Sequence, residues 1–319
     1  GDNRAGDNLY SNSVVALDAV TCRLRWHFQF TPHDEFDYDS TQVPVLADIE
    51  WPEGTASSRS GQPEGTASSR SGQQGRTRKA MLFANRNGFF YALDRITGEF
   101  LRATQLIDKV TWAKGIDDKG RPIKLPDSDP TPQGNWVCPS VKGATNWMGQ
   151  SYNPSTGLLY VHTLEQCGMY YRSSQEPQPM KNFSGGGATE EGGQVFLRAL
   201  DPKTGKRAWE YPMTGLGRMW TGTVSTAGGI IFSGDDDGHV IALDAKSGKN
   251  LWHFNVGEML TASPITYSVD GKQYIAIASA TAVFSFGLFE PVTGVEPPVI
   301  QMKKARFCEQ TPRQPHILS

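Results

Sequence analysis

The segment Thr31–Asp39 contains two carboxylates, Asp37 and Asp39, that are separated by one aromatic residue. At this spacing they could bind the same group. The segment follows one predicted strand and precedes another. In an extended backbone, residues i and i+2 point to the same face, so we expect the two carboxylates to converge. Converging carboxylates repel unless a proton or a cation lies between them, and a hard divalent or trivalent ion is the simplest such cation. The alternative is an Asp-rich surface turn, which an isolated Asp-x-Asp pair would favour.

The elements that must position this pair belong to an internal repeat. Each copy reads as a strand, an Asp, a turn closed by Gly, and a strand that ends in Trp, and is therefore predicted to be a hairpin. The copies are Ala16–Trp26, Ala92–Arg102, Ala199–Trp209 and Ala242–Trp252, with Cys22 in place of the glycine in the first and Arg102 in place of the tryptophan in the second.

The spacing of the repeat predicts a β-propeller. The last two copies start at residues 199 and 242, 43 residues apart, which matches the roughly 40–45 residues of one four-stranded blade. The repeated tryptophans are expected to pack between neighbouring blades. The chain holds about five blades' worth of sequence, with the first and last incomplete.

The predicted fold is all-β, with residues 1–290 forming a partial propeller of antiparallel four-stranded blades and residues 291–319 a Pro-rich tail. Within 52–78, the segment Pro52–Gln62 recurs letter for letter as Pro63–Gln73, and its polar composition predicts a mobile surface loop. Residues 108–134 are predicted to be a long loop over one face. The Gly-rich tract 185–193 is predicted to be a flexible connection.

Composition narrows the class of partner. With 38% hydrophobic residues, a net charge of −2 and scattered basic residues, the chain is predicted to be globular without a nucleic-acid or anionic-membrane partner. The chain opens without a methionine or an apolar leader, and we expect it to be a fragment or a processed chain. None of its four cysteines has C-x-x-C spacing. Cys138 and Cys167 are compatible with a disulfide in an oxidising compartment or with two buried thiols.

Several motifs in chain order, added to the repeat, resemble the quinoprotein alcohol dehydrogenases, the family that includes methanol dehydrogenase. They are Gly6–Tyr10, Thr31–Asp34, Asp37–Asp39, Ala84–Tyr91, Thr145–Trp147 and Thr226–Gly229. The resemblance implies an eight-bladed propeller that carries pyrroloquinoline quinone (PQQ) on its axis, of which this chain covers the C-terminal half to two-thirds. It also implies oxidation of a primary alcohol to an aldehyde and a periplasmic location, and it implies a disulfide between Cys138 and Cys167.

The resemblance assigns roles to five residues. Asp37 matches the catalytic base and a metal ligand, and Asp39 matches an extra carboxylate of the lanthanide-using members, so a lanthanide ion is implied before the alternative, Ca²⁺. Arg86 matches the arginine that reaches the quinone carbonyls. Asn146 and Trp220 match residues that contact the cofactor, although ordinary blade packing explains them nearly as well.

Parts of the family's site have no counterpart in this chain. The remaining metal ligands belong to the N-terminal half of the family's propeller, so that missing half is an implied partner, and a homodimer is a further arrangement to test. Electrons are expected to leave to an external cytochrome c or a membrane quinone. The alternatives are a non-catalytic propeller that serves as a binding or assembly scaffold, and a related sugar or polyol dehydrogenase. The joint presence of Asp37, Asp39 and Arg86 favours the alcohol dehydrogenase.

Overall fold

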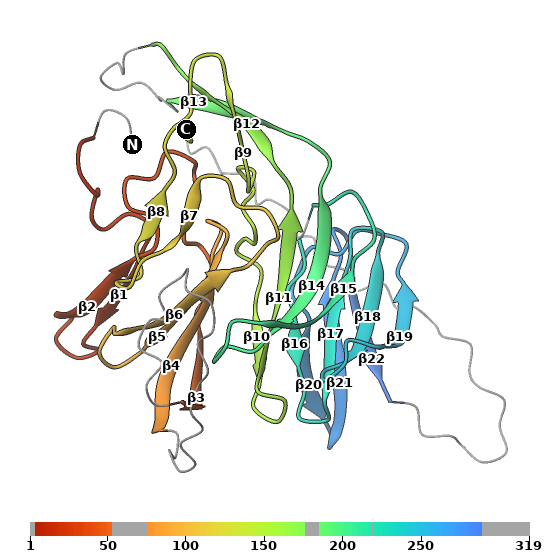
Figure 1. Ribbon diagram of the computed structural model, residues 1–319. Coiled ribbons are helices and arrows are strands. Elements are labelled where there is room, and N and C mark those ends of the chain that lie inside the picture. The colour runs from red at the N-terminus through yellow and green to blue at the C-terminus, as the bar shows by residue number, and fades with distance from the viewer. Residues whose placement is uncertain (1–3, 53–75, 176–184, 219, 289–319) are drawn as a thin grey trace, which may run out of the picture.

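The computed structural model describes residues 4–52, 76–175, 185–218 and 220–288 of the 319-residue chain. Every regular element in these ranges is a β-strand, and the antiparallel sheets follow one another like the blades of a fan (Figure 1). The predicted all-β fold built from propeller blades is therefore confirmed. Within the same ranges, no helix is long and apolar enough to cross a bilayer.

Three of the sheets are complete blades of four strands in sequence order. The first contains β3 (Val45–Trp51), β4 (Arg76–Ala84), β5 (Phe89–Asp94) and β6 (Phe100–Gln105). The second contains β10 (Ser151–Asn153), β11 (Leu158–Glu165), β14 (Gln194–Leu200) and β15 (Arg207–Pro212). The third contains β16 (Val224–Ser225), β17 (Ile230–Gly234), β18 (His239–Asp244) and β19 (Asn250–Asn255). Because β10 contacts both β3 and β16, the first strands of the three blades adjoin one another along one side of the fan.

Within the described residues, the blade at each end of the series has fewer than four strands. The first sheet contains β1 (Ser13–Leu17) and β2 (Leu24–Gln29), and the last contains β20 (Ile265–Val269), β21 (Lys272–Ala278) and β22 (Val283–Gly287). Three complete blades with a partial blade on either side agree with the predicted five, incomplete at both ends.

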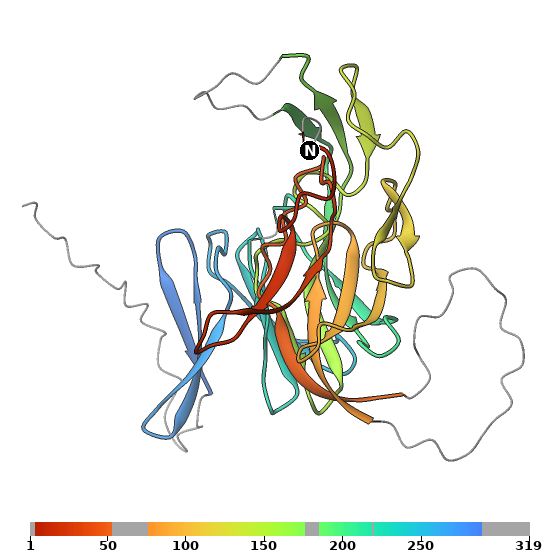
Figure 2. The ribbon, with the colours of Figure 1, turned by 90° about the vertical axis from the view of Figure 1, so that its left-hand side faces the viewer.

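Two further sheets arise from the connections between blades. Residues 108–134 contain the hairpin of β7 (Ala113–Ile116) and β8 (Pro122–Lys124), so the predicted long loop has strands of its own. A second sheet joins β9 (Asn135–Val137), β12 (Gly168–Arg172) and β13 (Gly186–Glu190), and it rises beyond one end of the blades (Figure 2). The prediction of a flexible connection at 185–193 is wrong for Gly186–Glu190, because the backbone of these residues pairs with β12. Most of the predicted insertion 52–78 and the whole predicted tail lie outside the described residues.

The turns of the repeat have the predicted geometry. The glycines that close them have left-handed φ values, +78° at Gly98, +70° at Gly205 and +72° at Gly248, and Cys22 adopts +55° at the same position of the first copy. In every copy the Asp carboxylate accepts a hydrogen bond from the backbone N–H two residues further on. The donors are Val20 (3.2 Å), Ile96 (2.9 Å), Lys203 (2.9 Å) and Lys246 (3.2 Å).

The repeated tryptophans pack between blades, as predicted. A Cβ atom added at Gly98 would lie 2.8 Å from Cδ2 of Trp26 in the preceding blade, and one added at Gly248 would lie 2.6 Å from Cε3 of Trp209. Each of these indoles therefore lies flat on a glycine of the next blade, which excludes any larger residue there. Trp252 meets the last blade instead through Phe286, at a ring-centroid distance of 5.2 Å.

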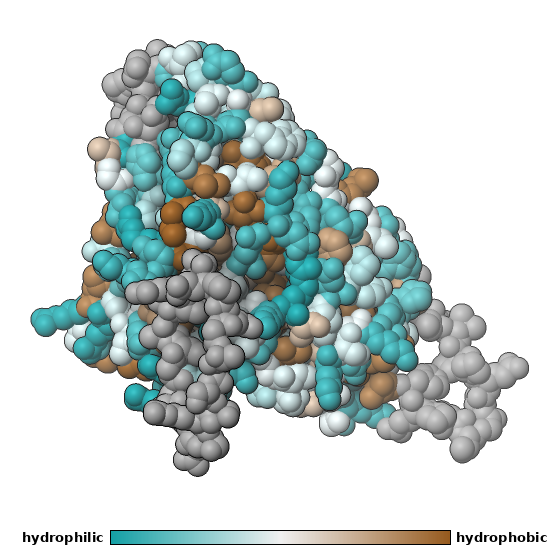
Figure 3. Space-filling view, in the orientation of Figure 1, coloured by the Kyte–Doolittle hydropathy of each residue, from teal (hydrophilic) through white to brown (hydrophobic). Residues whose placement is uncertain are grey.

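The apolar interior is divided among the blades rather than gathered in one core. Two large clusters lie on the two sides of the sheet β3–β6, and a third lies between the sheet of β11 and β14 and that of β17 and β18. On the face seen in Figure 3, hydrophobic residues occur in small groups among hydrophilic ones. The aromatic cluster that contains Phe36, Tyr38 and Trp112 is the one that supports the candidate site.

Candidate active site

The loop that carries the predicted carboxylates is held by its aromatic residues. Phe36 and Tyr38 are 2% and 0% exposed, and their rings pack on Trp112 at centroid distances of 5.7 and 5.6 Å. The Tyr38 hydroxyl donates to the carbonyl of Pro139 at 2.7 Å. Burial of aromatic rings of this size contributes about 1.5–3 kcal/mol each. Asp37 and Asp39, in contrast, keep 65% and 54% of their side chains exposed.

Arg86 brings the two carboxylates together. Its side chain is only 9% exposed, and Nη1 lies 3.3 Å from Oδ2 of Asp39 while Nη2 lies 3.6 Å from Oδ2 of Asp37. Nη2 also donates to the carbonyl of Val141. Gly143 lies directly against the stem of Arg86, because a Cβ atom there would be 2.6 Å from Cβ of Arg86. A fixed guanidinium therefore pairs with both carboxylates.

The reason for this convergence differs from the predicted one. Asp37 has a left-handed backbone with φ of +63°, so the loop is not extended at this residue. The two carboxylates meet because a turn aims Asp37 toward Arg86, and the alternation of an extended strand is not involved. The shared cation in this arrangement is the guanidinium group of Arg86.

The electrostatics of the loop favour protonation of Asp37 relative to a free carboxyl. Partial burial and then repulsion by Asp39 raise the pKa of Asp37, and attraction to Arg86 opposes them. Burial also raises the pKa of Asp34, although its carboxylate accepts hydrogen bonds from the backbone of Phe36 and Tyr38. A carboxylate with a raised pKa is a better proton acceptor once it is ionised.

Asn146 lies beside the carboxylate loop. Its Nδ2 donates to the carbonyl of Lys142 at 2.8 Å, its Oδ1 accepts from the N–H of Trp147 at 2.8 Å, and the Thr41 hydroxyl approaches that oxygen at 3.5 Å. Thr41 is two residues beyond Asp39, so Asn146 borders the site through it.

Trp220 is placed with a second tryptophan rather than with the carboxylates. Its ring lies 6.1 Å from that of Trp147 at an interplanar angle of 40°, and both side chains remain about two-fifths exposed. Trp147 follows Asn146 directly, which joins this pair of indoles to the site. The role of Trp147 was not predicted, and the signal that points to it is an exposed tryptophan next to a predicted cofactor contact.

The side chains of the site can be compared with the ligands that a metal ion and a quinone require. Two carboxylates suit a hard cation in kind, but Ca²⁺ takes six to eight oxygen ligands, and the described residues contain no cluster of three or more His, Cys, Asp or Glu side chains able to hold a metal. The residues therefore fit only part of a metal shell. For the quinone, Nε of Arg86 is a buried donor without a hydrogen-bond partner, which suits a ligand rich in acceptor oxygens.

A disulfide lies next to the residue that anchors the carboxylate loop. Cys138 and Cys167 form a disulfide bond, with a Cα–Cα distance of 4.3 Å. The sequence was compatible with a disulfide or with two buried thiols, and the structure has the disulfide. Pro139, next to Cys138, supplies the carbonyl that anchors Tyr38.

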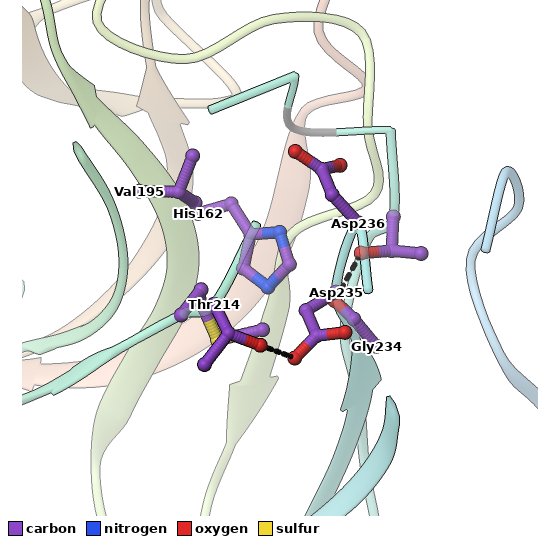
Figure 4. A pocket seen from close by; sticks show the side chains of 8 residues that line it. His162, Val195, Thr214, Gly234, Asp235 and Asp236 are labelled. Carbon is purple, nitrogen blue, oxygen red and sulfur yellow. Dashed lines mark hydrogen bonds between the residues drawn. The ribbon is translucent and has the colours of Figure 1, made fainter. Parts of the chain in front are cut away.

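A small cavity lies apart from the carboxylate pair, between the blades of β11 and β17 (Figure 4). His162 points into it, and its Nε2 lies 2.8 Å from Oγ of Ser233. Burial lowers the pKa of His162 to about 4. On the other side, the Thr214 hydroxyl donates to Asp235 at 2.5 Å. None of the predicted site residues lines this cavity.

Comparison with known proteins identifies similar sequences. The family model described as the glucose, ethanol and alcohol dehydrogenase β-propeller domain, designated PQQ, matches residues 1–58 and 213–275. The quinoprotein alcohol dehydrogenase PedH of Pseudomonas putida is 36% identical over 287 residues, which cover 86% of this chain and 44% of PedH. The 1-butanol dehydrogenase (cytochrome c) of Thauera butanivorans is 36% identical over 288 residues, which cover 86% of this chain and 38% of that enzyme.

Solved structures agree with the sequences. The quinohemoprotein alcohol dehydrogenase of Comamonas testosteroni superposes with a TM-score of 0.74 at 30% identity, over 93% of this chain and 46% of that one. A europium-containing methanol dehydrogenase gives a TM-score of 0.72 at 30% identity, over 85% of this chain and 45% of that one. The chain thus spans less than half the length of each of these relatives.

Proposed function

The chain is a relative of the PQQ-dependent alcohol dehydrogenases and shares their β-propeller fold, and from this premise we propose that it forms the part of such an enzyme that holds the catalytic carboxylate. The observation that carries the proposal is the joint approach of Asp37 and Asp39 to Arg86. Residues that serve only blade packing have no need to meet at one exposed point.

Asp37 is the general base in this proposal. It accepts the hydroxyl proton of a primary alcohol on its carboxylate, and the alcohol leaves as an aldehyde. The chemistry that PQQ supplies when bound is the acceptance of the hydride. Arg86 holds Asp37 in place and offers its unpartnered Nε to an acceptor oxygen of the cofactor.

Asn146, Trp220 and the neighbouring Trp147 form the proposed cofactor wall. An amide group and two exposed indoles present polar and flat apolar surfaces to a planar heterocycle. Asn146 borders the carboxylate loop through Thr41, and Trp147 follows Asn146 and packs on Trp220, which supports this role.

Asp37 and Asp39 are the proposed metal ligands. A trivalent lanthanide ion prefers more negative oxygen ligands than Ca²⁺ does, so two carboxylates favour a lanthanide, with Ca²⁺ as the alternative. The partial shell described above means that further ligands must come from elsewhere in the assembled enzyme.

The proposed partner is the rest of the propeller. The end blades expose apolar side chains that a neighbouring blade would cover, among them Leu17 (56% exposed) at one end and Ile265 (59%) and Val269 (50%) at the other. A second copy of this chain is the other arrangement to test. We further propose a periplasmic location, which the disulfide supports, and an external cytochrome c or membrane quinone as electron acceptor.

A non-catalytic scaffold is the second candidate function. The observation in its favour is the incomplete metal shell of the described residues. The two candidates differ in one respect that is easily measured, since only the enzyme transfers electrons from an alcohol.

The test is a chimera in which this chain replaces the aligned portion of PedH from Pseudomonas putida. The chimera is loaded with PQQ and either La³⁺ or Ca²⁺, and dye-linked oxidation of a primary alcohol is measured. We expect activity with La³⁺. Activity with Ca²⁺ alone would reject the role of Asp39, and a folded, PQQ-loaded chimera inactive with both ions would favour the scaffold.

A further inference from the structure

The Asp34 side chain accepts hydrogen bonds from the backbone on both sides of Asp37. Its Oδ1 accepts from the N–H of Phe36 at 2.9 Å, and its Oδ2 accepts from the N–H of Tyr38 at 2.7 Å. Nδ2 of Asn12 donates a third bond to Oδ2 at 2.8 Å. With three donors on its two oxygens, this carboxylate closes the loop around a single residue, Asp37.

A similar clamp occurs twice elsewhere in the part of the chain that the structure describes. In both cases an Asp carboxylate accepts bonds from the N–H groups two and four residues further on. Asp117 accepts from Lys119 (2.9 Å) and Arg121 (2.8 Å), and Asp235 accepts from Asp237 (3.1 Å) and His239 (2.8 Å).

The third residue after the clamping Asp distinguishes the copies. It is left-handed in all three turns, with φ of +85° at Gly120, +86° at Gly238 and +63° at Asp37. Glycine adopts this conformation freely, whereas a residue with a Cβ atom is strained in it, Asp and Asn less than most. Only the turn beside Arg86 places a side chain at the position where the two other clamps have glycine.

We propose that Asp34 is a positioning residue that holds Asp37 in this left-handed conformation and so aims its carboxylate at Arg86. Phe36 and Tyr38, whose N–H groups are clamped, turn inward and are almost fully buried, while the side chain of Asp37 between them turns out to the site. The strain at Asp37 is tolerated because the clamp and the two buried rings determine the backbone on either side. The inference rests on the proposed role of Asp37 as the base.

The backbone half of the inference is tested in the chain itself, without cofactor. Asp37→Gly and Asp37→Ala both remove the carboxylate, but only glycine fits a left-handed position without strain. We expect the Asp37→Gly variant to melt at a higher temperature than Asp37→Ala. We also expect Asp34→Ala to speed amide hydrogen exchange at Tyr38 more than Asp117→Ala does. Equal melting temperatures, or unchanged exchange at Tyr38, would overturn the inference whatever the activity.

The catalytic half is tested in the PQQ-loaded PedH chimera. A misplaced base lowers turnover without weakening substrate binding, so Asp34→Ala should lower kcat per bound PQQ by about 100-fold with little change in KM. Asp34→Asn retains one acceptor oxygen and should recover part of the loss. Asp117→Ala, which removes the same clamp from a turn outside the site, is the control. If Asp34→Ala matches this control in kcat while the unmodified chimera is active, Asp34 does not position the base. If the unmodified chimera is inactive, the proposed function fails, and the melting and exchange results still decide the conformation of Asp37.

Discussion

Replacement of Gly143 by alanine tests how tightly Arg86 is held. Gly143 has a left-handed φ of +82°, and a Cβ atom there would lie 2.6 Å from Cβ and 2.9 Å from the backbone Cα of Arg86. Because the nearest atoms belong to the base of the side chain and to the backbone, they cannot swing aside as the end of a flexible side chain would. Arg86 must therefore shift, and its pairs with Asp37 and Asp39 must lengthen.

The cost has two parts that a control can separate. An alanine in the left-handed conformation costs about 1–2 kcal/mol, and overpacking against Arg86 adds about 1–3 kcal/mol. Gly271 also has a left-handed φ, +76°, but no atom lies within 4 Å of an added Cβ. Gly271→Ala should thus lose only the first part, and the difference between the two variants isolates the contact with Arg86.

Urea unfolding of the two variants measures this difference. We expect Gly143→Ala to be less stable than Gly271→Ala by about 1–3 kcal/mol, with unchanged m-values. In the PedH chimera, Gly143→Ala should also weaken PQQ binding, whereas Gly271→Ala should leave it unchanged. Equal stability and equal PQQ affinity in the two variants would refute the close support of Arg86 by Gly143.

The remaining predictions concern the disulfide and the buried histidine. The Cys138–Cys167 bond joins two residues with a sequence separation of 29, so a Cys138→Ser/Cys167→Ser double variant should lose about 3–4 kcal/mol of unfolding free energy. Reductant should destabilise the wild type but not the variant. His162 is 3% exposed, and burial lowers its pKa from 6.5 to about 4. Between these two pH values His162 is therefore protonated in the unfolded chain but neutral in the folded one. The free energy of unfolding should be at its full value above pH 6.5 and should fall by about 3 kcal/mol as the pH drops toward 4. A His162→Gln variant with the same pH dependence of unfolding as the wild type would contradict this.

The architecture could be predicted because the repeat encodes it locally. An Asp, a Gly and a Trp at fixed positions define a turn, its left-handed residue and its contact with the next blade, and all three occur as expected around Gly98 and Gly248. The connections were harder to predict. The tract Gly186–Glu190 has no apolar alternation, yet it forms β13 because β12 provides a pairing edge.

The approach of Asp37 and Asp39 to one point could be predicted, but the geometry of that approach could not. The types and spacing of Asp37 and Asp39 suggested convergence, and the structure brings both to Arg86. The left-handed turn at Asp37 was hidden, because the usual marker of such a turn is glycine and this position has aspartate. The support of Arg86 by Gly143 was hidden for another reason, since these residues are distant in the sequence and meet only in the folded chain.

The account depends on Asp37 as the base, and single-turnover reduction of PQQ tests this most directly. In the metal-loaded PedH chimera, addition of a primary alcohol should change the absorbance of bound PQQ to that of the reduced form. The Asp37→Asn variant should bind PQQ equally well but reduce it about 100-fold to 10,000-fold more slowly, the range expected for loss of a general base. An Asp37→Asn chimera that reduces PQQ at the wild-type rate would contradict the account.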